Sequence, residues 1–340
     1  MAEARSMPQL VIVTPALRDA NNGNWQTAQR WQRHLRDRYA VRIVRQWPSA
    51  LACDDAAMIA LHARRSADSI AAWAARHPER GLAVVLTGTD LYRDIAVDAS
   101  AQRSLQLART LVVLQEAGPA ALDAGLRAKC RVIYQSTTPR KTLTKPARRL
   151  RAVMVGHLRE EKSPETLFAA ARLLAGHQDI DIDHIGEALD PALGEAARAT
   201  MAAAPNYRWL GGLPHAETRR RIQRAHLLIH CSRMEGGAHV IMEAVACGTP
   251  VLASAIDGNI GMLGADYAGY FPWGDADALA ALVLRCQESS RRDAARSRSP
   301  DGDDLLNTLQ AQCAKRAPLF APEAESAALR KLVRDLLLPR

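Results

Sequence analysis

One stretch of the chain, CSRMEGGAHVIMEAVACGTPVLAS at residues 231–254, restricts the possible folds more than any other. It follows the apolar run at 227–229, turns through the glycines at 236–237, and continues with helical spacing over 240–246. A Gly-Thr-Pro turn ends the helical spacing, and the chain then becomes apolar again. This order predicts a buried strand, a glycine loop, a helix, a turn and a second buried strand, which is the repeating unit of a parallel α/β sheet.

The predicted loop and helix suit a ligand that carries both phosphate and hydroxyl groups. A helix that opens on a glycine loop presents backbone N–H groups and the positive end of its dipole to phosphate oxygens. Glu235 precedes this helix, and Glu243 lies about two turns further on. Carboxylates beside a phosphate are unfavourable unless they bind something else, so we expect sugar and ribose hydroxyls there. The alternative is an ordinary α/β loop whose acidic residues face solvent.

Polar residues also follow two apolar runs in the first half of the chain. The run at 9–14 precedes a loop rich in Asn and Gly, and the run at 82–86 precedes the sequence TGTDLYRD. Both loops would lie at the carboxyl end of a parallel sheet, where open α/β sheets bind ligands. An Asn/Gly turn with a helix cap is the simpler alternative for the first loop. Between these two runs, we predict helices at 58–63 and 69–75.

Composition narrows the class of protein. At 340 residues the chain is long enough for two domains. The net charge of +9 suits anionic partners, but aromatic residues make up only 4% and no nucleic-acid module is recognisable, so we expect no nucleic-acid partner. Charged residues interrupt the apolar stretches, so we expect no stable membrane insertion. Six scattered cysteines without a CxxC pair, and no signal-peptide core, indicate a cytoplasmic enzyme.

A family resemblance rests on the central stretch. EGGAHVIMEA at 235–244, followed by GTPV at 248–251, resembles the nucleotide-sugar signature of the retaining glycosyltransferases of the GT-B fold (family four-like). That family includes sucrose synthases and phosphatidylinositol mannosyltransferases. The resemblance implies an α/β fold in which two Rossmann-like domains face a cleft and a C-terminal helix crosses back to the first domain.

The resemblance also divides the chain. It implies an acceptor-side domain at 1–138, a linker at 139–150, a nucleotide-sugar domain at 151–320 and a returning helix at 321–340. The linker sequence holds prolines and cations with little apolar content, and a solvent-facing linker is the expectation.

The resemblance also implies which residues bind the donor. GHLREEKS at 156–163 is similar to the family's diphosphate-binding element, in which Lys162 matches and His157 stands at the family's arginine position. Arg159 is the candidate for supplying the missing charge. The resemblance implies that Glu235 binds sugar hydroxyls and Glu243 binds the ribose. The implied phosphate and base contacts come from the backbone of Gly236, Gly237, Ala238, Val240 and Leu213.

The segments TPALRDANNGNWQTAQRW, LTGTDLYRD and SRMEGGAHVIMEA look like one narrow branch, the selenosugar synthases of the selenoneine pathway. This resemblance implies transfer from UDP-N-acetylglucosamine or UDP-glucose to selenophosphate, giving a 1-selenosugar, UDP and phosphate, without a metal or other cofactor. Thr87 stands where the wider family carries a histidine, which suits an acceptor other than a sugar hydroxyl. The acceptor candidates are Arg18, Asn22, Gly23, Asn24, Thr87, Asp90, Arg93 and His239, and His239 is also a catalytic candidate with Glu235, Lys162 and Arg159.

Three alternatives remain open. An ordinary glycosyltransferase would require a hydroxyl acceptor of a lipid or polysaccharide. A non-catalytic sensor would bind a nucleotide sugar without turnover. An epimerase of the same fold would need no acceptor. The sequence makes no prediction about the oligomeric state.

Overall fold

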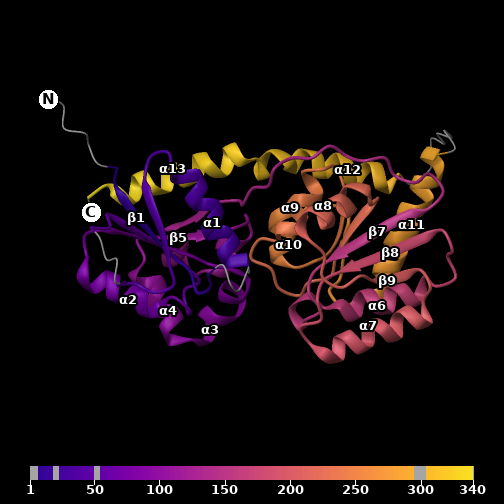
Figure 1. The fold of residues 1–340 in the computed structure, drawn as a ribbon, viewed down its shortest axis with the longest axis horizontal. Coiled ribbons are helices and arrows are strands. Elements are labelled where there is room, and N and C mark those ends of the chain that lie inside the picture. The colour runs from indigo at the N-terminus through magenta and orange to yellow at the C-terminus, as the bar shows by residue number, and fades with distance from the viewer. Residues whose placement is uncertain (1–6, 18–22, 50–53, 295–303, 340) are drawn as a thin grey trace. The chain divides into compact units, whose positions relative to one another are not determined.

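The computed structural model describes residues 7–17, 23–49, 54–294 and 304–339. It contains two compact units, formed by the described parts of 1–136 with 322–340 and by the described parts of 137–321. The chain therefore leaves the N-terminal unit once and returns to it as the final helix, drawn in yellow in Figure 1.

The N-terminal unit is built on a six-stranded sheet in which every neighbouring pair is parallel. In spatial order its strands are β2 (Ala40–Val44), β1 (Gln9–Val13), β3 (Ala57–Leu61), β4 (Gly81–Val85), β5 (Thr110–Val113) and β6 (Cys130–Val132). Its helical segments are α1 (Gly23–Leu35), α2 (Ala67–Arg76), the π-helix η2 (Asp90–Asp94), α3 (Ile95–Val97), α4 (Ala99–Leu107), the 3₁₀ turn η3 (Gly118–Ala121), α5 (Ala124–Arg127) and α13 (Pro322–Leu337).

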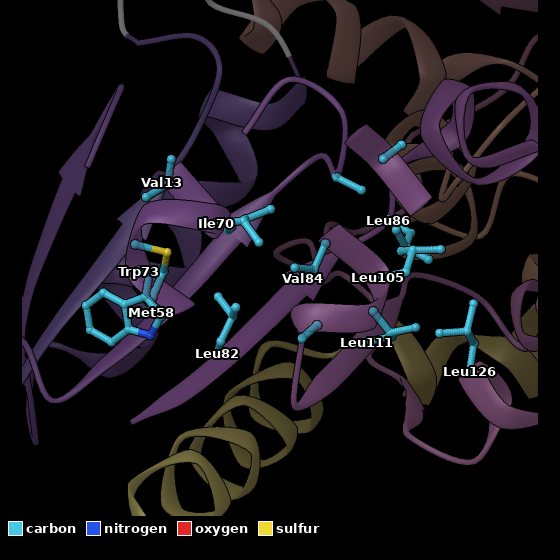
Figure 2. Close-up of a cluster of buried hydrophobic side chains, with 14 of the residues drawn as sticks. Val13, Met58, Ile70, Trp73, Leu82, Val84, Leu86, Leu105, Leu111 and Leu126 are labelled. Atoms are coloured by element: carbon cyan, nitrogen blue, oxygen red, sulfur yellow. The ribbon is translucent and has the colours of Figure 1, made fainter. Parts of the chain in front are cut away.

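Helices cover both faces of this sheet, so alternate residues of each strand pack into different cores. Met58 and Ala60 face a core that includes Trp73 of α2 and Leu105 of α4, and Figure 2 shows part of this cluster. Ile59 packs on the other face with residues of α1 and α13. Burial on both faces explains why the central strands are continuous apolar runs without a polar alternation.

The predicted helix at 58–63 is wrong, because residues 57–61 form the central strand β3. The segment AMIAL contains good helix formers and is completely buried. A short apolar run of this kind does not distinguish a buried strand from a buried helix by its periodicity. Pairing with β1 and β4 decides the conformation.

Helix α13 belongs to the N-terminal unit although it comes from the end of the chain. Leu329, Leu332 and Leu336 are buried in the core shared with α1. A Cβ atom at Gly81 would lie 2.3 Å from the carbonyl oxygen of Leu336, so only glycine permits this close approach between β4 and α13.

The C-terminal unit contains the second six-stranded parallel sheet. In spatial order its strands are β12 (Tyr270–Phe271), β11 (Val251–Ser254), β10 (Leu227–His230), β7 (Leu150–Val155), β8 (Ile180–Ile185) and β9 (Tyr207–Trp209). Its helical segments are η4 (Glu160–Lys162), α6 (Pro164–Leu173), α7 (Pro191–Ala203), α8 (His215–Arg224), α9 (His239–Val245), α10 (Asp257–Leu263), α11 (Ala276–Ala294), α12 (Leu305–Arg316) and η5 (Ala317–Phe320). The strand, loop, helix and strand predicted over 227–254 are β10, α9 and β11 with their connections.

Each sheet has one position where the direction of strand addition reverses. In the N-terminal unit β2 is added on one side of β1 and β3 on the other. In the C-terminal unit β8 is added on one side of β7 and β10 on the other. The loops that follow these strands diverge at the carboxyl edge, which is where open parallel sheets bind ligands.

The segment predicted as a linker is mostly exposed, and several of its residues are hydrogen-bonded to the C-terminal unit. The Arg140 amide donates to Ala246 O, and Thr142 Oγ1 donates to Cys247 O at 2.6 Å. Gln223 of α8 donates to Lys141 O. These backbone contacts, which the polar composition does not reveal, order the segment. No helix in the described part of the chain has the length and apolar character needed to cross a membrane.

Candidate functional site

The strongest cluster of charged side chains in the C-terminal unit lies at the reversal between β7 and β10. Lys162 Nζ, in the loop after β7, donates to Glu235 Oε1 at 2.5 Å, in the loop after β10. His230, the last residue of β10, places its Nε2 3.2 Å from the same carboxylate oxygen. The sequence separates Lys162 from Glu235 widely, and the sheet brings them together.

The surroundings keep Glu235 ionised. Burial alone would raise the pKa of this carboxyl, but the charge of Lys162, together with His230, outweighs burial and holds the pKa well below its usual range. Burial also lowers the pKa of His230, so its imidazole is neutral near pH 7. Glu235 therefore accepts hydrogen bonds over the whole physiological pH range.

The loop that carries Glu235 is supported from two sides. The Arg233 amide donates to Glu161 O at 3.0 Å, which connects it to the loop that carries Lys162. A Cβ atom at Gly258 would lie 2.1 Å from Glu235 O, so the start of α10 packs directly against the Glu235 backbone. The positions of the two charged side chains therefore depend on neighbouring backbone segments.

Glu243, on α9, is the centre of a second cluster. His215 Nε2 lies 2.6 Å from Glu243 Oε1, His239 Nδ1 lies at 3.4 Å and Arg219 Nη1 lies at 3.6 Å. Burial opposes ionisation, but these three neighbours lower the pKa of Glu243 to about 2. The interaction with Glu243 in turn raises the pKa of His215.

Arg219 connects this cluster to the start of the C-terminal unit. It is buried, and it donates to Thr137 Oγ1 at 2.8 Å and to Thr138 O at 2.9 Å. Since these contacts hold the guanidinium in place, Glu243 has a cation of defined position beside it.

The residues whose backbone is predicted to bind the donor lie at the start of α9 and in the connection between β9 and α8. Gly236 and Ala238 are buried, whereas Gly237, Val240 and Leu213 are half-buried. The first hydrogen bonds of α9 are donated by Ile241 and Met242 to Ala238 O. The preceding amides therefore come before the hydrogen-bonded turn, which is where free N–H groups are found at a helix start.

Two predicted diphosphate ligands, His157 and Arg159, contact residues other than Glu235. His157 Nδ1 accepts from the Glu187 amide at 3.1 Å, and Arg159 Nε lies 3.8 Å from Glu161 Oε2. Both residues are exposed. Among the described residues, the basic side chains within 4 Å of Glu235 are Lys162 and His230.

Sequence reasoning missed His230, His215 and Arg219. His230 was recognisable as the polar end of an apolar strand only five positions before Glu235. His215 and Arg219 lie four residues apart on one face of α8, but their proximity to Glu243 comes from the packing of α8 against α9.

The candidates of the N-terminal unit have different surroundings. Thr87 is half-buried and Arg93 is exposed, whereas Asp90 is fully buried. The Asp90 carboxylate accepts from the amides of Ala63 and Arg64 at 2.6 and 3.3 Å. Asp90 thus orders the loop after β3, and its burial argues against the predicted direct contact with an acceptor.

The remaining acceptor candidates lie near the start of α1. Gly23 is exposed and Asn24 is half-buried, and Thr27 Oγ1 donates to Gly23 O at 2.8 Å. The predictions for Arg18 and Asn22 fall outside the described residues.

A histidine and two carboxylates approach one another beside Asp90. His62 Nδ1 lies 3.1 Å from Asp90 Oδ1, and His62 Nε2 lies 3.7 Å from Asp94 Oδ2. One ligand-type atom from each of these three residues lies within 4.8 Å of the others. His62 directly follows β3. Because residues 58–63 were predicted as a helix, the sequence did not indicate that His62 lies near these carboxylates.

One known protein family is similar to the part of the chain that carries Lys162, Glu235 and Glu243. Residues 135–299 match the family model described as glycosyl transferases group 1. This segment is therefore similar to the glycosyl transferases group 1 family. A comparison with curated protein sequences gave no match.

Solved structures resemble nearly the whole chain. HepE from Anabaena in complex with UDP superposes with a TM-score of 0.71 at 17% identity, covering 97% of this chain and 100% of HepE. Sucrose-phosphate synthase from Thermosynechococcus elongatus has a TM-score of 0.72 at 18% identity, covering 97% and 99%. A glycosyltransferase from Rickettsia africae has a TM-score of 0.70 at 11% identity, covering 98% and 99%. These similarities confirm the predicted GT-B fold.

Proposed function

We propose that the protein transfers N-acetylglucosamine or glucose from a UDP-sugar to selenophosphate, giving a 1-selenosugar, UDP and phosphate. The observation that carries the donor half is the contact between Lys162 and Glu235 at the reversal of the C-terminal sheet. A structure of HepE holds UDP-glucose, which supports a UDP-sugar as the donor.

The donor residues have separate roles in this proposal. Glu235, kept ionised by its surroundings, accepts hydrogen bonds from sugar hydroxyls, and Glu243 accepts them from the ribose. Lys162 and the amides at 236–240 bind the diphosphate. Lys162 supplies positive charge where the leaving group becomes negative, an effect that favours the transition state over the bound substrate.

The proposed reaction makes one carbon–selenium bond. The selenium atom of selenophosphate attacks C1 of the sugar, and the bond from C1 to the UDP oxygen breaks. Water then cleaves the selenium–phosphorus bond and releases phosphate. Because selenium is a soft and strong nucleophile, the proposal assigns no general base.

The acceptor half rests on the three segments that resemble selenosugar synthases. Of its candidates, Arg93 is exposed and remains proposed, and Asp90 is proposed only to order the neighbouring loop. His239 contacts Glu243, so we assign it to the donor side.

The breadth of the matching family favours a second candidate, a glycosyltransferase that uses a hydroxyl acceptor of a lipid or polysaccharide. Mass spectrometry of the purified protein with UDP-N-acetylglucosamine or UDP-glucose, with and without selenophosphate, separates the two. The proposal expects a selenium-isotope product and UDP only when both substrates are present. UDP release without selenophosphate, or none in either case, would contradict it.

A further inference from the structure

Two arginines of the N-terminal unit are attached to one carboxylate. Arg64 Nε donates to Asp94 Oδ2 at 2.8 Å, and Arg93 Nε donates to Asp94 Oδ1 at 3.1 Å. Arg64 comes from the loop after β3, and Arg93 comes from η2, which follows β4. Asp94 therefore holds two guanidinium groups from neighbouring strands next to each other.

The attachment leaves most donors of both arginines available. A guanidinium has five N–H donors, and each Nε uses one of them on Asp94. The side chains of Arg64 and Arg93 are 39% and 46% exposed, while that of Asp94 is 7% exposed. Among the described residues, Asp94 is the hydrogen-bond partner found for these two guanidiniums. The remaining donors can bind a ligand that approaches from solvent.

Buried polar groups beside Asp94 hold the neighbouring backbone in place. Asp90 binds the amides of Ala63 and Arg64, and His62 lies between Asp90 and Asp94 with a left-handed backbone (φ 73°). Burial alone would raise the pKa of Asp94, but the hydrogen bonds from Arg64 and Arg93 lower it, so Asp94 stays ionised.

Arg64 lies at a position where open parallel sheets generally bind ligands. Strand β3 flanks the reversal of the N-terminal sheet, and the loop after it carries Arg64. The corresponding loops of the C-terminal sheet carry Lys162 and Glu235. The carboxyl edge at such a reversal is the general ligand position of open parallel sheets.

We propose that Arg64 and Arg93 form a binding site for a tetrahedral oxyanion of the phosphate type. The two guanidiniums outnumber the Asp94 carboxylate that they share, Asp90 and Asp98 also lie near Arg64, and the planar N–H pairs that point away from Asp94 match the oxygens of a phosphate. The identification of this anion as the phosphate group of the acceptor rests on the proposed function, whereas binding of the anion itself does not.

The same cluster does not favour a metal ion. His62, Asp90 and Asp94 have the ligand types of a metal site. However, both Asp94 oxygens accept from guanidiniums, and both Asp90 oxygens accept from backbone amides. A divalent cation would have to displace these donors and would lie beside two positive charges.

Isothermal titration of the full-length protein with inorganic phosphate tests the site. Arg64→Gln and Arg93→Gln should each weaken phosphate binding roughly tenfold to a hundredfold, because each removes charge-assisted hydrogen bonds. Arg64→Lys should fall between wild type and Arg64→Gln, because the charge remains and the fork is lost. Circular dichroism confirms that each variant is folded.

Arg76→Gln is the matched control. Arg76 is an exposed arginine at the end of α2, about 15 Å along the helix from its start beside Arg64, so phosphate binding should be unchanged. Equal phosphate affinity in Arg64→Gln and Arg76→Gln would overturn the site. Phosphate binding that requires added Mg²⁺ or Mn²⁺ would also overturn it and would indicate a metal centre instead.

Steady-state kinetics keep this inference separate from the proposed function. Arg64→Gln should raise the KM for selenophosphate while leaving the KM for the UDP-sugar unchanged. Phosphate binding that depends on Arg64, without any selenosugar product, would retain the anion site and reject the proposed acceptor. Product formation with an unchanged selenophosphate KM in Arg64→Gln would reject the anion site and retain the proposed acceptor.

Discussion

The two units have the same kind of sheet, and in each a carboxylate at the carboxyl edge is held by two basic side chains, which are much more exposed in the N-terminal unit. In the C-terminal unit a carboxylate, Glu235, has Lys162 and His230 around it. In the N-terminal unit Asp94 is buried, and Arg64 and Arg93 reach outward from it. In open parallel sheets the topology determines the general ligand position, whereas the loop residues determine which chemical groups a ligand there must carry.

The units also differ in how a glutamate held by basic neighbours is used. Glu235 lies in a loop at the proposed donor site. Glu325, on α13, accepts from Arg30 Nε at 3.0 Å, Trp31 Nε1 at 2.7 Å and the Ser136 amide at 2.9 Å. These donors lie on α1 and at the point where the chain leaves the N-terminal unit, so we assign Glu325 a structural role.

The largest expected effect is at Glu235. Glu235→Gln keeps the shape but removes the acceptor charge beside Lys162, so kcat/KM for the UDP-sugar should fall roughly a hundredfold to a thousandfold. Initial rates with varied UDP-sugar measure this. Glu195→Gln, at an exposed glutamate of α7, is the control and should retain full activity. Normal kinetics in Glu235→Gln would remove the assignment of the donor site.

Glu325→Gln should destabilise the N-terminal unit by about 3 kcal/mol, because Arg30 loses its partner carboxylate in the interior. Hydrogen exchange should rise in peptides of α1 and α13 and stay unchanged in α6 and α7. Glu323→Gln, an exposed change in the same first turn, should have no effect. Equal exchange in both variants would reject a structural role for Glu325.

The same pair of variants tests the pH dependence. The pKa of Glu325 is lowered to about 2, although burial opposes this, because His34, Arg30, Ser136 and Trp31 favour the carboxylate. Its contribution to stability is therefore present above the ordinary glutamate pKa of about 4.3 and is lost as the pH falls toward 2. Urea unfolding between pH 2 and pH 7 should show this loss in wild type and Glu323→Gln, and a smaller one in Glu325→Gln.

A smaller effect is expected at Gly258. Gly258→Ala places a methyl group against Glu235 O, so the loop must shift and UDP should bind roughly tenfold more weakly while the fold is retained. Gly176→Ala is the control, since a Cβ at Gly176 meets nothing within 4 Å. Unchanged UDP affinity by calorimetry in Gly258→Ala would show that the Glu235 backbone does not position the donor.

The smallest effect is expected at His215, whose side chain is 71% exposed. Its pKa is raised by Glu243, so Glu243→Gln should lower it toward about 6.5. NMR titration of the His215 ring in wild type and in Glu243→Gln measures the change. The ion pair stabilises the fold most below pH 6.5 and is lost as the pH rises through the raised pKa. An unchanged His215 pKa in Glu243→Gln would contradict the pairing.

The predictability of the site differs between the units for a physical reason. Glu235 and Glu243 lie in a local pattern whose spacing indicates a loop and a helix, and the family resemblance indicates Lys162, so all three were predicted from the sequence. Arg64 was missed because β3 consists of helix-forming residues, and its strand conformation depends on pairing with β1 and β4.

The sequence alone determined the parallel α/β class and the position of the glycine loop, because apolar runs and turn residues act over a few neighbouring positions. Only the tertiary structure decided which charged side chains contact one another. Lys162 meets Glu235 and His215 meets Glu243, because packing joins residues that the chain separates. Arg64 and Arg93 share Asp94 for the same reason, since adjacent strands bring their loops to one edge of the sheet.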